Sequence, residues 1–93
     1  MDKINPGVYK HYKGKYYDVF GVVVKSGTED STEPEYDVVY RPWYGDRKFT
    51  RRSLREFTEE VDVKEYSYKG PRFFFLREFV DPKLQIVARL FAE

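Results

Sequence analysis

The chain contains no cysteine, and its 93 residues include one histidine, one methionine and one tryptophan. Without cysteine, the protein has no disulfide, no thiolate nucleophile and no cysteine-ligated zinc. A metal would have to bind one imidazole and carboxylates that are scattered along the chain, because no Asp/Glu cluster has ligand spacing. We therefore expect neither a metal nor a cofactor.

Long apolar runs are also missing. Residues 1–6 lack the apolar core of a signal peptide, and no stretch approaches the ~20 apolar residues of a membrane span. We therefore expect a soluble, cytoplasmic protein that does not bind membranes. The 17 Lys and Arg nearly balance the 16 Asp and Glu, for a formal net charge of +1. Any electrostatic attraction of nucleic acid must then come from a local patch.

Aromatic residues are plentiful, at 19% of the chain. Each aromatic side chain buries roughly 150–250 Å² when it packs. A chain of this length forms one domain, which must make efficient use of a small core. Most aromatic residues are therefore expected to be structural. We predict a single domain over residues 1–93, with a β portion over about 7–80 and a helix over about 82–92.

Short alternating or apolar runs predict β-strands through most of the chain. The predicted strands cover 8–13, 16–25, 36–41, 48–52, the surroundings of Val61 and Val63, and 72–80. In the second strand, simple alternation places Phe20 and Val22 on one face. Pro42 is expected to end the pairing of the third strand, because proline has no backbone N–H to donate. Residues 66–71 are predicted to be a connection.

Two helical segments complete the predicted fold. Ser53 and Glu56 have the spacing of a capping box, which predicts one helical turn. Asp81 and Pro82 are typical of a helix start. After them, a stripe of apolar residues with helical spacing predicts a helix that packs on the sheet, made of Leu84, Val87, Leu90 and Phe91. The pattern predicts a mainly β fold of about 5–6 antiparallel strands in a curled sheet or barrel, with one short helical turn and a C-terminal α-helix.

Several segments resemble, in order, the small bacterial domains called DUF1653. The matching residues are Gly7-x-Tyr9-x-His11-Tyr12-Lys13-Gly14, Tyr17-x-Val19, Val38-Val39-Tyr40-Arg41-x-x-Tyr44-Gly45, Arg52-x-Leu54-x-x-Phe57-x-Glu59-x-Val61 and Pro71-Arg72-Phe73. The resemblance implies an SH3-like small β-barrel of unassigned function, and it adds no catalytic residues because none is established for the family. This sequence departs from the family pattern at Ser53, where the family usually has proline. Residues 74–93 have no counterpart in it, so the C-terminal helix rests on pattern alone.

Two aromatic-basic segments, over 7–15 and 38–46, contain the only histidine and the only tryptophan. Histidine titrates near neutrality, arginine suits anions, and exposed aromatic rings stack on flat ligands. Tyr40, Trp43 and Tyr44 could form such a stacking platform. The candidate ligand-binding residues are His11, Arg41, Trp43, Tyr44, Arg52 and Arg72. The alternative for the arginines is an ion-pair network with the carboxylates of Asp18, Asp37, Glu56 or Glu59, and for the aromatic rings it is core packing.

Three functions are compatible with these residues. The first, which we favour, is a non-catalytic module that binds a nucleotide, a short single-stranded nucleic acid or a peptide. The second is a protein-interaction or oligomerising domain, including a homodimer through the C-terminal helix. The third is a small hydrolase with His11 as base and Arg41 or Arg72 beside an anion. No phosphate-loop, dinucleotide or zinc-protease motif adds a further class.

Overall fold

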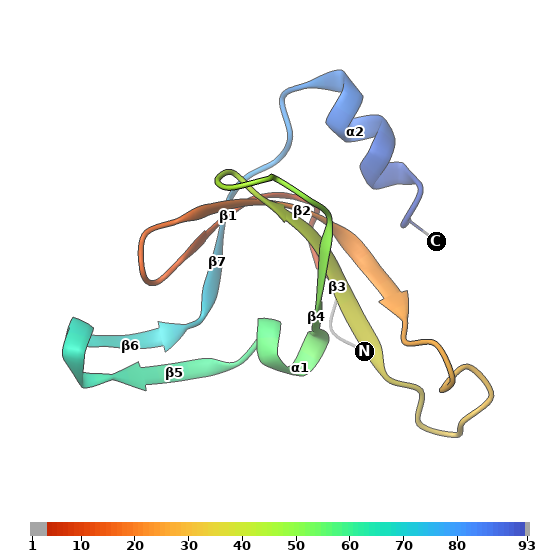
Figure 1. Ribbon diagram of the computed structural model, residues 1–93, viewed down its shortest axis with the longest axis horizontal. Helices are drawn as coiled ribbons and strands as arrows, with labels where there is room; N and C mark the ends of the chain where they lie inside the picture. Colours follow the sequence, from red (N-terminus) through yellow and green to blue (C-terminus); the bar gives the residue numbers. More distant parts are fainter. Residues whose placement is uncertain (1–3, 93) are drawn as a thin grey trace.

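The computed structural model describes residues 4–92, and its main feature is an open five-stranded antiparallel sheet (Figure 1). The strand order is β4-β3-β2-β1-β7. The strands are β1 (Gly7–His11), β2 (Tyr16–Val24), β3 (Tyr36–Pro42), β4 (Thr50–Ser53) and β7 (Phe73–Arg77). The predicted mainly β fold is confirmed, in the form of an antiparallel sheet rather than a closed barrel.

The sheet stays open because the chain between its two edge strands forms a separate hairpin. The helical turn α1 (Leu54–Phe57) follows β4, and β5 (Glu60–Val63) then pairs only with β6 (Tyr68–Pro71). The 3₁₀ turn η1 (Lys64–Tyr66) joins these two strands. The prediction that 66–71 is only a connection was therefore wrong. The predicted strand over 72–80 is also shorter, because β7 spans Phe73–Arg77 alone.

The C-terminal helix α2 (Pro82–Arg89) begins where the sequence indicated. The Asp81 side chain accepts a hydrogen bond from the Lys83 backbone N–H, as an N-cap residue should. The helix ends earlier than predicted, and Leu90 is 78% exposed rather than packed. Within residues 4–92, neither α1 nor α2 is long and apolar enough to cross a membrane.

A β-bulge in β2 reverses the expected alternation of its side chains. Val19 lies opposite Tyr40, whereas Gly21 lies opposite Val39, so Phe20 is an extra residue on β2. An extra residue shifts every later side chain to the other face. Phe20 consequently packs under α2, whereas Val22 packs on the opposite side. The prediction that Phe20 and Val22 share a face was wrong for this reason.

Pro42 does not end the pairing of β3. It lies opposite Tyr17, and the backbone N–H of Trp43 still donates to the Tyr16 carbonyl at 3.0 Å. Successive amides point to opposite edges of a strand, so the position without an N–H faces away from β2. On that other side, β4 pairs with β3 only as far as Tyr40. Proline is therefore tolerated here, as it is at the edge of a sheet.

The sheet carries one core cluster on each face, and Figure 1 shows α1 and α2 on opposite sides of it. The α1-side core consists of Tyr9, Tyr17, Val19, Val38, Tyr40, Phe57 and Phe73. The α2-side core consists of Val8, Phe20, Phe79 and Ala88, with Leu84, Val87 and Phe91 packed against it. A Cβ atom at Gly21 would lie 2.4 Å from that of Phe91, so glycine allows the residues after α2 to approach β2.

Candidate functional site

The structure divides the six candidate residues between the two faces of the sheet. Arg41 and Trp43 meet Asp18 on the α2 side. The Asp18 carboxylate is 3% exposed and accepts hydrogen bonds from Arg41 Nη2 at 3.0 Å and from Trp43 Nε1 at 2.8 Å. The Arg41 guanidinium also lies over the ring of Phe20, 5.9 Å from its centroid. This Asp18 cluster joins β2 to β3, which matches the ion-pair alternative for Arg41.

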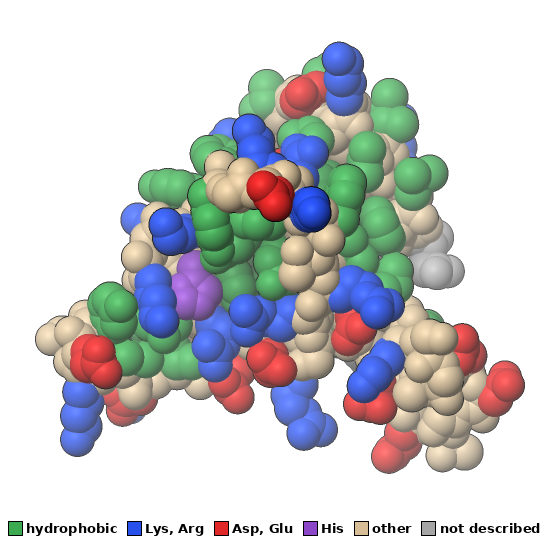
Figure 2. Space-filling view, in the orientation of Figure 1, with side chains coloured by type: hydrophobic (Ala, Val, Ile, Leu, Met, Phe, Trp, Pro, Cys, Tyr) green, Lys and Arg blue, Asp and Glu red, His purple; other side chains and the backbone are tan. Residues whose placement is uncertain are grey.

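The other four candidates, His11, Tyr44, Arg52 and Arg72, gather on the α1 side. With Lys13, Lys15 and Tyr17 they form what we call the His11 surface. Figure 2 shows the histidine on the visible face of the molecule with Lys and Arg side chains around it. The surface draws on β1, the β1–β2 turn, β2, the loop after β3, β4 and the junction between β6 and β7. Tertiary folding is therefore what brings these residues together.

His11 lies at the centre of this surface and is held in one orientation. Its Nδ1 accepts a hydrogen bond from the Lys13 backbone N–H at 3.1 Å. Its ring stacks on Tyr12 with centroids 4.4 Å apart and meets the ring of Phe73 edge-on at 4.8 Å. Because Nδ1 is an acceptor, the neutral ring carries its proton on Nε2.

The surroundings of His11 keep it uncharged. Burial lowers its pKa to about 4, and the positive charges of Arg72, Arg52 and Lys13 act in the same direction. An imidazole with so low a pKa is a weak base at neutral pH. The hydrolase hypothesis is disfavoured on this ground, since it requires His11 to accept a proton.

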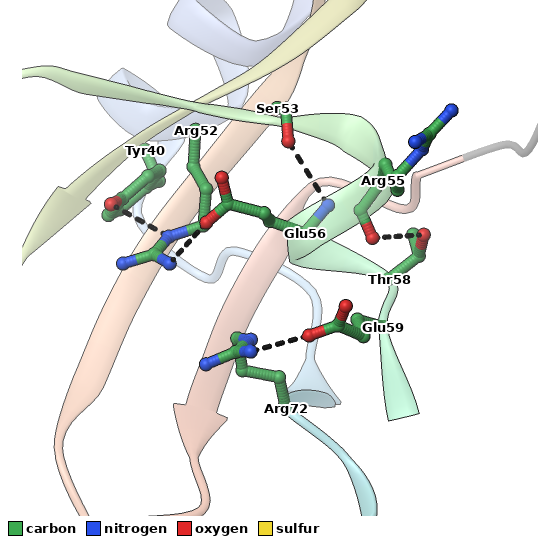
Figure 3. A network of polar contacts seen from close by, with 8 residues as sticks. All are labelled: Tyr40, Arg52, Ser53, Arg55, Glu56, Thr58, Glu59 and Arg72. Carbon is green, nitrogen blue, oxygen red and sulfur yellow. Dashed lines mark hydrogen bonds and ion pairs between the residues drawn. The ribbon is translucent and has the colours of Figure 1, made fainter. Parts of the chain in front are cut away.

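Arg52 and Arg72 are each anchored by one carboxylate at or just after α1 (Figure 3). Arg52 Nη1 lies 3.2 Å from Glu56 Oε2, and its guanidinium lies over the Phe73 ring at 5.6 Å. Arg72 Nη2 lies 2.6 Å from Glu59 Oε1. Arg72 Nε is buried and has no hydrogen-bond partner among residues 4–92. Both guanidiniums thus keep donors that no carboxylate uses.

The α1 turn explains why these carboxylates are placed there. Ser53 Oγ accepts a hydrogen bond from the Glu56 backbone N–H at 3.1 Å, which is half of the predicted capping box. The Glu56 side chain, which would form the other half, instead reaches Arg52. Asp18, Glu56 and Glu59 each pair with one of the candidate arginines. The fourth carboxylate named as an alternative partner, that of Asp37, lies 4.0 Å from Arg51 instead.

Tyrosines border the basic part of the His11 surface. The hydroxyls of Tyr17 and Tyr44 are 3.0 Å apart, and the Lys15 ammonium lies 4.6 Å from the centre of the Tyr44 ring. Burial raises the pKa of Tyr17 above its usual range, so its hydroxyl stays protonated. Tyr40, Trp43 and Tyr44 do not form one platform, because Tyr40 is buried in the α1-side core and Trp43 is bonded to Asp18.

The aromatic rings that support His11 from behind were not predicted from the sequence. Tyr12 stacks on Tyr68 with centroids 5.4 Å apart and meets the ring of Tyr66 edge-on at 5.6 Å. These contacts attach the β1–β2 turn to the β5–β6 hairpin. The only possible signal was the alternation of Tyr66 and Tyr68, and it is indistinct because β6 is short and begins at a 3₁₀ turn.

Comparison with known proteins places the chain in a family. The family model described as "Protein of unknown function (DUF1653)" matches residues 7–75. The chain belongs to the DUF1653 family. A crystal structure of a DUF1653 protein from Bordetella bronchiseptica is 32% identical in sequence, with a TM-score of 0.62. That match covers 84% of this chain and 94% of the other. No curated protein matches.

The DUF1653 match includes the whole His11 surface and the Asp18 cluster but not α2. Since the family has no described function, it supplies no role for any of these residues. In the described part of the chain, no group of three or more His, Asp or Glu side chains could hold a metal ion. A groove of about 670 Å³ between β2 and the C-terminal segment is lined mainly by apolar residues and by none of the six candidates.

Proposed function

We propose that this DUF1653 domain is a non-catalytic module that binds an anionic or planar ligand, such as a nucleotide, a short nucleic acid or a peptide, at the His11 surface. The observation that carries the proposal is the convergence of Lys13, Arg52 and Arg72 on one imidazole, all three close enough to lower its pKa. Grouped positive charges repel one another, and a bound anion relieves that repulsion.

The ion pairs at this surface leave room for such a ligand. The Glu56 and Glu59 side chains are 57% and 48% exposed, so neither pair is closed off from solvent. A guanidinium has five N–H donors in a fixed fork, and one carboxylate uses only part of them. Arg52 Nη2 and Arg72 Nη1, which have no hydrogen-bond partner among residues 4–92, can therefore bind an anion. The cysteine-free composition suits a reducing cytoplasm, where we expect this binding to take place.

An amide-resolved NMR titration tests the proposal. The panel comprises nucleotides, short single-stranded DNA and RNA, and a proline-rich peptide. We expect saturable shifts at His11 to Lys15, Arg52 and Arg72 for one ligand class, and their loss in Arg52→Gln and Arg72→Gln. Arg55→Gln is the matched control, because Arg55 is exposed on α1 and its side chain has no described ion pair. No response to any ligand would overturn the proposal.

A second candidate function is a protein contact through α2, supported by its exposed apolar residues. Val80, Ile86 and Leu90 are 75%, 59% and 78% exposed. Ile86 and Leu90 are four residues apart, so they lie next to each other on the outer face of the helix. If this face forms a homodimer, the solution mass should be twice that of the chain and Leu90→Lys should halve it. A monomeric wild type removes the homodimer form of this candidate.

A further inference from the structure

We infer that the anion bound at the His11 surface is the dianionic phosphate group of a small phosphate monoester, and that His11 remains neutral when it binds. The inference rests on the proposed function and names its ligand class. It is based on the charge of the surface, on its unused hydrogen-bond donors and on the fixed orientation of the imidazole.

The first argument is charge. Four cationic side chains, those of Lys13, Lys15, Arg52 and Arg72, face two carboxylates, those of Glu56 and Glu59. The surface therefore has an excess of two positive charges. A phosphate monoester carries about −1.5 to −2 charges at neutral pH, whereas a carboxylate carries a single charge and would leave part of the excess unpaired. A dianion thus fits the surface best.

The second argument is the supply of donors. Arg52 donates from Nε to Tyr40 and from Nη1 to Glu56, and Arg72 donates from Nη2 to Glu59, so Arg52 Nη2 and Arg72 Nη1 have no partner among residues 4–92. Arginine forks match phosphate oxygens with two parallel hydrogen bonds. The neutral His11 ring adds an Nε2–H donor, because Nδ1 is already an acceptor. Three phosphate oxygens can accept from donors supplied by three segments of the chain.

The third argument concerns the proton on His11. Protonation would put a hydrogen on Nδ1, which faces the Lys13 backbone N–H 3.1 Å away, and two donors would then point at each other. A bound dianion offsets the nearby cations, but it does not remove this local conflict. The charged or titratable groups around His11 are Tyr12, Lys13, Lys15, Tyr17, Tyr44, Arg52, Glu56, Glu59 and Arg72.

The inference predicts a distinctive pH dependence. Because His11 does not titrate above about pH 5, only the ligand changes charge between pH 5 and pH 7. The second ionisation of a phosphate monoester has a pKa near 6, so affinity for adenosine monophosphate should rise ~10-fold over this interval. Sulfate is a dianion throughout, so its binding should stay flat. Calorimetric titrations of both ligands at several pH values, with spectra confirming the folded state, provide the measurement.

Further ligands and an NMR signal separate the inference from its alternatives. Adenosine and acetate should not bind measurably, whereas ribose 5-phosphate should. If adenosine monophosphate binds more tightly than ribose 5-phosphate, the base contacts the tyrosines, and equal affinities show that the phosphate alone is recognised. The imidazole nitrogen shifts of His11 should report a neutral ring with and without adenosine monophosphate at pH 6.

Variants provide the structural control. Arg72→Gln should weaken binding of adenosine monophosphate by at least ~10-fold, Arg72→Lys should restore part of it, and Arg55→Gln should leave it unchanged. Binding of adenosine as tight as that of its monophosphate, a flat pH profile for the phosphate ester, or protonation of His11 on binding would each overturn the inference and leave the proposed function standing. No binding of any ligand would overturn both.

Discussion

The Asp18 cluster and the His11 surface both place arginine beside aromatic rings, yet they lie on opposite faces of one sheet and differ in how completely they are closed. At Asp18, a carboxylate that is 3% exposed binds both Arg41 and Trp43. At the His11 surface, the two carboxylates are about half exposed, although Arg72 is no more exposed than Arg41 and Nε of both arginines is buried without a partner among residues 4–92. The carboxylate that holds arginine is therefore shielded from solvent at Asp18 and open to solvent at the His11 surface.

The largest expected effect on stability is at the Asp18 cluster. Asp18→Ala removes the acceptor of both Arg41 and Trp43 and leaves a partly buried guanidinium without its partner. We expect a loss of about 3 kcal/mol in the free energy of unfolding, since breaking a buried ion pair typically costs that much. Denaturant unfolding measures it, and ligand binding at the His11 surface should be unchanged in the protein that remains folded. A loss below about 1 kcal/mol in the free energy of unfolding would show that the Asp18 cluster does not hold the fold together more than an exposed ion pair does.

The next effect concerns the packing of the C-terminal segment. Gly21→Ala places a Cβ atom 2.4 Å from that of Phe91, so this segment must move away from β2. We expect a destabilisation of about 2 kcal/mol, which is typical of overpacking. A double-mutant cycle with Phe91→Ala isolates the clash, because the alanine substitution should be milder in that background. Additive effects of the two substitutions would contradict direct contact.

A smaller effect should appear at the His11 surface, as a dependence of the free energy of unfolding on pH. The pKa of His11 is about 4 in the folded protein and lies near 6.5 in the unfolded chain, so the unfolded chain binds more protons between these values. Stability should therefore rise with pH across this window and be complete above about pH 6.5. Because solvent screens this partly exposed site, we expect a gain of only about 1 kcal/mol.

His11→Gln should flatten this part of the stability profile. Unfolding of both proteins at several pH values between about 4 and 7 provides the comparison. Arg52→Gln and Arg72→Gln should each raise the pKa of His11, as read from its imidazole shifts, because each removes a positive charge that now lowers it. A wild-type pKa near 6.5 would show that the imidazole is neither buried nor surrounded by cations as described.

The smallest effect on stability is expected at the ion pairs of the His11 surface. Glu59→Gln removes the partner of Arg72, and half-exposed pairs contribute at most about 1 kcal/mol. The same change leaves the Arg72 guanidinium free for ligand, so affinity for an anion should increase rather than fall. Thermal unfolding and ligand titration of one protein preparation measure the two effects. A large loss of stability would place Arg72 with Arg41 as a structural residue.

Local patterns in the sequence were sufficient to predict much of the fold. The alternation in β1 to β3 predicted those strands, and Asp81 with Pro82 predicted where α2 begins. The bulge at Phe20 was not predictable from alternation, because an extra residue becomes evident only when the partner strand is paired. Strand β6 was missed because it is four residues long and contains Gly70 and Pro71.

The candidate residues were harder to predict because their partners are distant in sequence. Arg41 and Arg52 each end a strand predicted from the sequence, over 36–41 and 48–52, so position in a strand does not separate them. The register of β3 and β4 decides on which face of the sheet each arginine lies. The carboxylate that pairs with Arg41 is 23 positions away in sequence, and the one that pairs with Arg52 is 4 positions away. Only the second pair has a spacing that local reasoning can recognise, so the division of the candidates into two groups required the fold.

The bulge at Phe20 interrupts the alternation of side chains along β2, so odd-numbered residues before it and even-numbered residues after it face the α1 side. The first half of β2 sends Tyr17 and Val19 into the α1-side core, and after the extra residue Val22 packs there too. Removing Phe20 would leave a regular ladder in which Val22 still lies opposite Val38 on the α1 side, but the α2-side core would lose its Phe20 ring. The extra residue thus supplies a core side chain without altering the register of the strand. Homologous chains should accept insertions in the 26–35 loop far more readily than a single deletion here.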